Sequence, residues 1–532
     1  MTSPDGLRWW QRGIIYQIYP RSFKDANGDG IGDLQGIIDG LEHLVDLGVD
    51  ALWISPFYPS PMVDFGYDVA DYCDVHPLFG DLATFDRLVA AAHQRGLKLI
   101  IDWVPNHTSD QHAWFLESRS SRDNPKRNWY IWRDAKPDGS PPNNWGSWFG
   151  GPAWEWDAVT SQYYLHSFTV EQPDLNWANP EVDAAMKDGL HFWMRRGVDG
   201  FRMDVVHVIV KDPGLRDNPL NPDASPNLPA NDIGGRQIHL YDRANPGIHD
   251  KMKEFRRITD QYGDTVIVGE IWEFNLGEWV KYYGDGDGVQ LPFNFRLMEI
   301  PRWDAALFRQ SVDELEAALP PYAQPNYVLS SHDKPRILTR YGAAQARVAA
   351  MLLFTLRGTP TMYNGDEIGM RDGVITPDQV QDPQGKILGV ERSRDGCRTP
   401  LQWDATANAG FSTAEPWLPV NDDYAVVNIA RQRHEPQSML SLYRALIALR
   451  RAEPALHGGR YASLESPDGT YVYVRESGAD RFVVALNFTD APVTVPLAQG
   501  GDLLLSTALD RQEPVSGSVA LRPNEGVIIR VK

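Results

Sequence analysis

Three acidic residues stand directly after short apolar runs, where a buried strand has no structural use for a carboxyl group. They are Asp204, Glu270 and Asp333. Cleavage of an acetal between two sugars needs a carboxyl group on each side of the bond. One protonates the leaving oxygen, and the other attacks the anomeric carbon or activates water. On adjacent strands, Asp204 and Glu270 could face each other at the roughly 5–5.5 Å expected of a retaining pair.

Arg202 lies two residues before Asp204, so strand alternation places both side chains on the same side. We expect the adjacent guanidinium to keep Asp204 ionised, as a nucleophile requires. Taken singly, each of the three acids has a simpler interpretation as a solvated loop end or a salt-bridge partner. Their joint occurrence at the ends of successive apolar runs is more specific, and it predicts a glycosidase site.

The elements that would position these residues alternate between strands and helices. Helix periodicity is found at residues 34–47, 82–95, 182–196 and 343–356, and strand candidates lie at residues 13–20, 49–56, 97–104, 198–206, 265–272, 288–295, 327–333 and 359–366. This alternation predicts parallel strands buried on both faces. Periodicity alone leaves an open doubly wound sheet possible. Polar residues at most strand ends favour a closed (β/α)₈ TIM barrel, whose active site lies at that mouth.

Two stretches interrupt the barrel pattern, and the last part of the chain departs from it. Residues 1–105 and 174–454 are expected to form the barrel, with an insertion at about 367–411 after strand eight. Residues 106–173 are too long for an ordinary βα loop, so we predict a small inserted domain after strand three. From residue 455 the pattern becomes alternating, which predicts a C-terminal antiparallel β domain over 455–532.

The composition of the chain limits the kinds of molecule that it can bind. The net charge of −20 makes nucleic acid and anionic membranes poor partners. The two cysteines, Cys73 and Cys397, have no metal or redox spacing. We see neither a secretory signal nor an apolar stretch near the ~20 residues of a membrane span. The expectation is a cytoplasmic enzyme for a small neutral substrate. The oligomeric state stays open.

Four motifs at these strand ends resemble glycoside hydrolase family 13, the α-amylase family, and the resemblance runs from Trp9 to the C-terminus. It implies that Asp204 is the nucleophile, Glu270 the acid and then the base, and Asp333 the ligand of the sugar 2- and 3-hydroxyls. His107 and His332 would hydrogen-bond the same ring, and Arg202 would hold Asp204. Asp102 would support the barrel. The motifs are Asp102-Trp103-Val104-Pro105-Asn106-His107, Gly200-Phe201-Arg202-Met203-Asp204-Val205-Val206, Val268-Gly269-Glu270-Ile271-Trp272 and Ser331-His332-Asp333.

Within that family the chain is most similar to the oligo-1,6-glucosidase and α-glucosidase group. The resembling segments are Gln172-Pro173-Asp174-Leu175-Asn176, Asp64-Phe65-Gly66-Tyr67-Asp68 and Ser393-Arg394-Asp395-Gly396-Cys397-Arg398-Thr399-Pro400. The likeness implies that Asp64 binds the terminal glucose, that Tyr67 stacks on it and that an arginine pairs with Asp64. Arg394 is the first choice for this arginine and Arg398 the second. Such a closed end implies an exo-acting enzyme.

Linkage preference depends on finer features. In the same group, Val directly after the nucleophile tends to accompany α-1,6 activity, and here that residue is Val205. We therefore favour isomaltose-type substrates. A β-branched residue also suits any buried strand, and an α-1,4 preference stays open. Phe149, Gln172 and the insertion after strand eight are expected to shape the acceptor side.

The segment from Asp25 to Asp33 has oxygen-bearing side chains at alternate positions with interleaved glycines. It resembles the start of a calcium loop but lacks the glutamate at position 12 of an EF-hand. The matching loop of the α-glucosidase group commonly binds Ca²⁺. The resemblance thus implies a structural ion, held by the side chains of Asp25, Asn27, Asp29 and Asp33 and the carbonyl of Ile31. No organic cofactor is expected.

Two other functions use the same scaffold. A transglucosylase or sugar isomerase forms the same covalent intermediate and differs only in its acceptor. A catalytically inactive binding or assembly subunit is a more remote alternative, since such relatives usually carry a membrane span and have lost catalytic acids. Here Asp204, Glu270 and Asp333 are all present.

Overall fold

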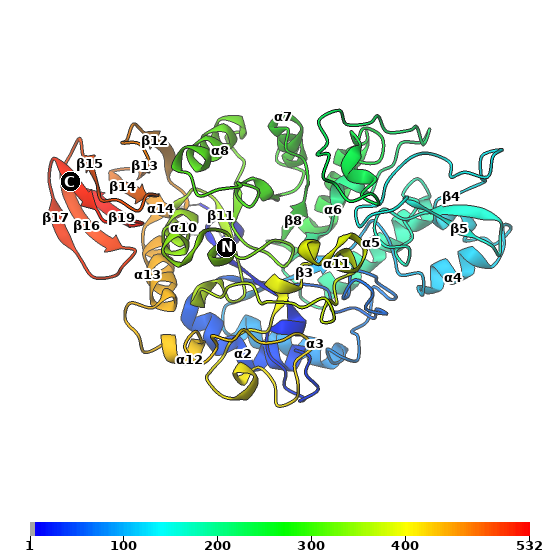
Figure 1. The fold of residues 1–532 in the computed structure, drawn as a ribbon, viewed down its shortest axis with the longest axis horizontal. Helices are drawn as coiled ribbons and strands as arrows, with labels where there is room; N and C mark the ends of the chain where they lie inside the picture. Colours follow the sequence, from blue (N-terminus) through cyan, green and yellow to red (C-terminus); the bar gives the residue numbers. More distant parts are fainter. Residues whose placement is uncertain (1–5) are drawn as a thin grey trace.

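A closed barrel of eight parallel strands forms the centre of the computed structural model, which describes residues 6–532 (Figure 1). The spatial order is β1-β11-β10-β9-β8-β7-β3-β2. The predicted (β/α)₈ barrel is therefore confirmed, and the open sheet is excluded. Residues 1–5 of the predicted first segment lie outside the described residues. The barrel strands are β1 (Ile15–Ile18), β2 (Ala51–Ile54), β3 (Lys98–Trp103), β7 (Gly200–Met203), β8 (Val266–Glu270), β9 (Leu291–Asn294), β10 (Asn326–Val328) and β11 (Thr359–Tyr363).

Each strand is shorter than its predicted run, and most are shorter at both ends. The barrel interior is filled by side chains including Ile15, Trp53, Ile100, Val268 and Phe293. A larger apolar cluster lies between the strands and the surrounding helices. Burial on both faces explains why the strands are near-continuously apolar in sequence.

The outer helices begin and end where local chemistry predicts. α2 (Leu34–Leu47) starts at Asp33, whose carboxylate accepts the Gly36 N–H at 2.6 Å, and ends at Gly48 with φ of +92°. α3 (Leu82–Gln94) has the same kind of cap at Asp81. The other helices are α1 (Trp9–Arg12), α4 (Ala113–Ser120), α5 (Pro180–Arg195), α6 (Ile248–Thr259), α7 (Leu276–Trp279), α8 (Ala305–Ala318), α9 (Ile337–Tyr341), α10 (Ala343–Thr355), α11 (Pro383–Leu388), α12 (Ile429–Gln432), α13 (Met439–Ala452) and α14 (Pro454–His457).

The chain between β3 and α5 forms a small unit with its own sheet, made of β4 (Trp132–Arg133), β6 (Gln162–Leu165) and β5 (Trp154–Asp157). Its apolar core includes Ile131, Trp145, Trp154 and Leu165. This sheet projects to one end of the molecule, opposite the C-terminal domain (Figure 1). The inserted domain after strand three is thus present.

A second excursion, residues 206–247 after β7, was not anticipated as a unit. It contains only short 3₁₀ turns, Val206–Val208 and Gly234–Arg236, yet it packs against the inserted domain. The Trp145 indole donates to the Arg216 carbonyl at 2.8 Å, and Asn144 exchanges hydrogen bonds with Asn218. The two excursions therefore stand together over one side of the barrel mouth.

The C-terminal domain has a six-stranded antiparallel sheet, ordered β12-β13-β14-β19-β16-β17, and a two-stranded sheet of β15 and β18. The alternating residues 470–474, 482–488 and 526–531, which predict strands, correspond to β13, β14 and β19. The strand bounds are β12 (Arg460–Leu464), β13 (Thr470–Ser477), β14 (Asp480–Asn487), β15 (Val493–Pro496), β16 (Gly501–Ser506), β17 (Glu513–Val515), β18 (Ser518–Leu521) and β19 (Gly526–Val531). Among residues 6–532, no helix combines the length and the apolar character that crossing a membrane requires.

Two buried arginines lie where this domain meets the barrel. Arg450 of α13 donates to the carbonyls of Phe354 and Leu356, at the end of α10, and to that of Leu456 in α14. Arg475 of β13 donates to the carbonyls of Thr355, Leu456 and Gly459. Backbone oxygens at a helix end have no partner within the helix, so these guanidiniums satisfy groups that would otherwise be buried unpaired.

Candidate active site

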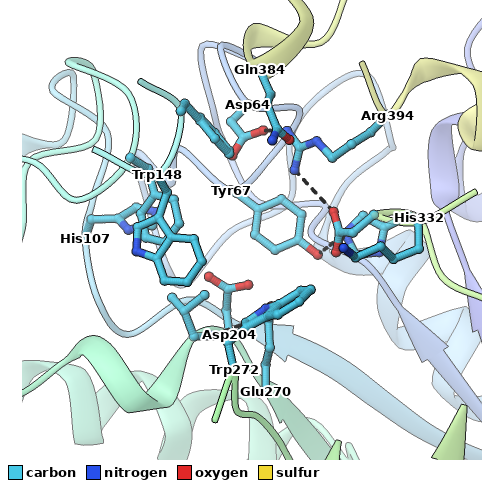
Figure 2. A pocket seen from close by; sticks show the side chains of 15 residues that line it. Asp64, Tyr67, His107, Trp148, Asp204, Glu270, Trp272, His332, Gln384 and Arg394 are labelled. Atoms are coloured by element: carbon cyan, nitrogen blue, oxygen red, sulfur yellow. Dashed lines mark hydrogen bonds and ion pairs between the residues drawn. The ribbon is translucent and has the colours of Figure 1, made fainter. Parts of the chain in front are cut away.

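A cavity of about 230 Å³ opens at the carboxyl ends of the barrel strands (Figure 2). It contains all three predicted catalytic acids and six of the nine predicted sugar-binding residues. The remaining three, Gln172, Arg202 and Arg398, are buried behind the lining. The lining residues are Asp64, Tyr67, His107, Trp148, Phe149, Phe168, Asp204, Val205, Glu270, Trp272, His332, Asp333, Lys334, Gln384 and Arg394.

The floor of the cavity is organised around one guanidinium. In the register between β3 and β7, Asp102 lies beside Arg202, so both side chains point into the barrel. Arg202 contacts Asp102 at 2.9 Å, Asp204 at 2.7 Å and also Glu270. The single cation thus gathers carboxyl groups from β3, β7 and β8, and it brings the predicted nucleophile and acid to the same point.

Three buried carboxyl groups share this one positive charge, so full ionisation is unfavourable. Burial, followed by the charge of Glu270, raises the pKa of Asp204 well above its usual range despite the opposing effect of Arg202. Burial likewise raises the pKa of Asp102 to about 6. The expectation that the adjacent guanidinium keeps Asp204 ionised is therefore wrong, because burial and the charge of Glu270 outweigh the effect of Arg202.

The backbone after the nucleophile turns sharply. Val205 has φ of +36° and ψ of +42°, a left-handed conformation that β-branched residues rarely adopt. Such a conformation costs on the order of 1–3 kcal/mol and persists where the surroundings enforce it. Here it aims the Val205 N–H at Oε2 of Glu270, 3.2 Å away. The strained backbone of Val205 therefore supplies a hydrogen bond that helps to place the carboxyl group of Glu270.

Asp333 lies on the opposite wall among cations. Arg394 contacts it at 3.2 Å, Arg398 at 3.3 Å and His332 at 3.3 Å. Burial alone would raise the pKa of Asp333, but the neighbouring His332 and the charges of Arg394 and Arg398 hold it well below its usual range. Asp333 is therefore ionised, and its carboxylate can accept hydrogen bonds.

An aromatic wall stands between Asp333 and the floor. The Tyr67 ring lies parallel to that of His332, with ring centroids 5.5 Å apart, and its hydroxyl contacts the His332 Nε2 at 2.9 Å. Figure 2 shows the two rings together at the centre of the cavity. Burial lowers the pKa of His332 well below its usual range, so its ring is neutral and can hydrogen-bond a sugar hydroxyl.

One end of the cavity is closed by an ion cluster. Arg394 contacts Asp64 at 2.8 Å, which resolves the choice between Arg394 and Arg398 in favour of the first. Arg398 instead donates to the His332 carbonyl at 2.8 Å and lies behind Asp333. Arg394 also contacts Asp382 at 2.7 Å. Asp64 and Asp382 are thus held together by one guanidinium at this end of the cavity.

Two of the predicted residues on the acceptor side have different positions. Phe149 lines the cavity, with the Arg394 guanidinium 4.9 Å from its ring centroid. Gln172 is fully buried behind the wall, where its amide contacts Asp64 at 3.3 Å and His107 at 3.1 Å. The prediction that Gln172 shapes the acceptor side is therefore wrong. Its amide orients two residues of the sugar-binding wall.

Sequence reasoning missed six residues. Trp272 lies two residues after Glu270, and Lys334 directly follows Asp333. Their closeness in sequence to the predicted acids could have identified both as residues of the site. Trp148 directly precedes the predicted Phe149. Phe168 lies in the loop before Gln172. Asp382 caps the short helix α11 after strand eight and Gln384 lies in its first turn, and a helix of six residues is too short to be marked by periodicity.

The predicted calcium loop is ordered by its own backbone. Asp25 accepts the Gly30 N–H at 2.8 Å and the Ser412 hydroxyl at 2.6 Å, while Asp29 accepts the Ile31 N–H at 2.9 Å. Asn27 accepts the Asp29 N–H at 2.9 Å. Across the part of the chain that the structure describes, no three His, Cys, Asp or Glu side chains converge as metal ligands would.

Comparison with known proteins places these features in a family. Residues 17–459 match the model of the α-amylase catalytic domain, and residues 458–527 match a domain of unknown function, DUF3459. The chain is 41% identical over 529 residues to a probable α-glucosidase of Rhizobium meliloti (strain 1021), with 97% of this chain and 94% of that protein covered.

Two further likenesses extend over the whole chain. An oligo-1,6-glucosidase of Heyndrickxia coagulans is 39% identical, with 98% of this chain and 99% of that protein covered. The crystal structure of an α-glucosyl transfer enzyme superposes with a TM-score of 0.93 at 39% identity, covering 99% of this chain and 100% of the other. Because the family match spans most of the sequence, this protein belongs to the α-amylase family and is a glycoside hydrolase.

Proposed function

We propose that this enzyme is a retaining, exo-acting α-glucosidase that releases glucose from the non-reducing end of short α-linked oligosaccharides. The observation that carries the proposal is the Arg394 cluster, in which one guanidinium contacts Asp64 at 2.8 Å and Asp333 at 3.2 Å. A closed end lined by carboxylates suits the hydroxyls of one terminal sugar. The names of the two curated relatives agree with this class of substrate.

The proposed reaction has two steps. Asp204 attacks the anomeric carbon as Glu270 gives its proton to the glycosidic oxygen, and the departing sugar leaves a covalent glucosyl–Asp204 ester. Glu270, now a carboxylate, then takes a proton from water, which attacks the same carbon and releases Asp204. Asp333 holds the 2- and 3-hydroxyls of the distorted ring through both steps, and Arg202 holds the two reacting carboxyl groups in place.

We further propose a preference for α-1,6 linkages. Val205 lines the cavity directly beside Asp204, where its side chain can contact the bond to be cleaved. Initial glucose release from isomaltose and maltose at equal concentration tests the preference. Faster isomaltose cleavage is expected, and faster maltose cleavage would contradict the linkage preference while leaving the α-glucosidase assignment in place.

The Val205→Thr variant should move the preference towards maltose. Threonine has almost the same shape, but its hydroxyl changes the polarity next to the bond. Pocket substitutions of this size change discrimination by about tenfold, so the maltose-to-isomaltose ratio of kcat/KM should rise by that order. Val374→Thr, at a residue whose side chain is 83% exposed, is the matched control and should leave the ratio unchanged. An unchanged ratio in both variants would remove Val205 from the linkage argument.

Transfer to a second sugar is the alternative that a specific observation favours, because the structural likeness includes an α-glucosyl transfer enzyme. A transglucosylase or sugar isomerase would share the ester on Asp204 and replace water by a sugar hydroxyl. Quantifying trisaccharide products alongside glucose in the same assay separates the two. Each transfer to a disaccharide makes one trisaccharide and releases one glucose as the leaving sugar, so roughly equal amounts of the two at low substrate concentration would favour transfer, and glucose without trisaccharide would favour hydrolysis.

We also propose that the loop from Asp25 to Asp33 binds a structural Ca²⁺. The donor set consists of hard oxygen atoms, which suit this ion. Asp25 and Asp33 are both buried, and burial raises the pKa of Asp33, with the charge of Asp25 adding to it. A divalent cation would offset that repulsion. Removal of Ca²⁺ by a chelator should lower the melting temperature by several degrees, with metal content following it; no change in either would contradict the site.

A further inference from the structure

The hydrogen bonds of Glu270 identify a residue to which the proposed mechanism gives no task. Its Oε2 atom contacts Arg202 and accepts the Val205 N–H, as described above. Its Oε1 atom accepts a hydrogen bond from the Trp272 indole Nε1 at 2.7 Å. The indole N–H is the only donor of a tryptophan side chain, so the ring must be placed accurately to make this contact. Figure 2 shows the indole beside Glu270 on the cavity wall.

The structure holds the indole in that place from two further strands. Phe295, which follows β9, stacks on the Trp272 ring with centroids 3.8 Å apart and planes 22° apart. The Lys334 ammonium, which follows β10, lies 4.8 Å from the ring centroid. Lys334 is in turn paired with Glu299 at 2.5 Å. Because β8, β9 and β10 are neighbours in the barrel, three successive strand ends orient this one N–H.

We propose that Trp272 is a positioning residue for the acid/base Glu270, an inference that rests on the function proposed above. When Glu270 gives its proton to the glycosidic oxygen, negative charge appears on its carboxylate. The Trp272 N–H already faces that charge, so its hydrogen bond strengthens as the bond to the leaving sugar breaks. A hydrogen bond donated to a carboxylate favours its ionised form.

The Trp272→Phe variant tests this role, because phenylalanine keeps an aromatic ring for the stack on Phe295 but has no N–H to donate. We expect kcat/KM for isomaltose to fall about tenfold, the size of one charge-assisted hydrogen bond. The basic limb of its pH profile should move upward by about one unit, because the carboxylate loses a stabilising donor. An aryl α-glucoside with a good leaving group should lose less activity, since its departure needs less help from the acid.

Trp9→Phe is the matched control. The Trp9 indole donates to the Asp264 carbonyl at 2.7 Å, so this variant removes a similar bond from α1, ahead of the first barrel strand and away from the mouth. Its pH profile should equal that of the wild type. A Trp272→Phe enzyme with the wild-type basic limb and equal losses on both substrates would overturn the positioning role. A wild-type enzyme that cleaves no α-glucoside would instead contradict the proposed function.

Discussion

The Asp204→Ala variant is expected to lose at least about 10⁴-fold in kcat, the scale seen when an enzyme loses its covalent nucleophile. Its fold should persist, because Arg202 still contacts Asp102 and Glu270 and the crowding of carboxyl groups on one cation is relieved. Steady-state hydrolysis of isomaltose and the melting temperature measure the two effects. Full residual activity would refute the assignment of the nucleophile.

Azide distinguishes the roles of the two carboxyl groups. In Asp204→Ala, azide can occupy the vacated space and attack an activated aryl α-glucoside directly, giving a β-glucosyl azide. In Glu270→Ala the ester on Asp204 still forms from an aryl substrate, and azide attacking that ester gives an α-glucosyl azide. The two variants should therefore yield opposite anomers. The same anomer from both would contradict the proposed pair.

The Arg394→Ala variant should lose both activity and stability. Arg394 contacts Asp64, Asp333 and Asp382, so its removal leaves buried carboxylates uncompensated. Breaking a buried ion pair from one side costs about 3–5 kcal/mol of unfolding free energy. We expect kcat/KM for disaccharides to fall by about 10³-fold, because Asp64 and Asp333 lose the group that fixes their geometry.

The pH dependence of this loss has a definite sign. Burial raises the pKa of Asp64 to about 6. Burial alone would also raise that of Asp382, but the charges of Arg394 and Arg398 hold it at about 2. Arg394 compensates these groups only when they are ionised. The stability difference between wild type and variant should therefore be largest near neutral pH and shrink as the pH falls from about 6 towards 2.

Arg371→Ala provides the comparison. This exposed arginine also contacts two carboxylates, Asp422 and Asp423, but solvent screens them. Activity and melting temperature should change little. If Arg394→Ala were equally mild, the Arg394 cluster would not close the pocket in the way proposed here.

The sequence predicts the barrel well because its signals are local. Apolar runs mark all eight strands, most of these runs end in polar residues, and the acids at the ends of β7 and β8 are recognisable by type and position. Arg394 could be predicted from a motif, but its partner Asp382 could not, since the irregular chain after β11 has no periodicity that indicates its path. Residues 206–247 are similar: abundant Pro, Asn and Asp predict loops and do not indicate where the loops pack.

The left-handed backbone of Val205 could not be predicted for a different reason. A β-branched residue in a strand motif predicts extended backbone, whereas the structure has it left-handed. Only the tertiary arrangement explains the departure, because the turn presents the Val205 N–H to Glu270. Likewise, the role of Gln172 behind the wall depends on which side of Asp64 the loop passes, and residue type alone does not determine that.

The two matched family segments meet at residues 458–459, as though the chain were two interchangeable modules. The guanidinium of Arg475 contradicts that division, because it binds carbonyls of Leu456 and Gly459 on both sides of the junction, as well as Thr355 of the barrel helix α10. If the chain ended at that junction, helix α10 would lose Arg475, which donates to the carbonyl of Thr355 at its end. The boundary between the two family matches is therefore not a structural boundary. The C-terminal sheet supports the barrel directly, and a replacement domain would have to supply a new donor to these carbonyls.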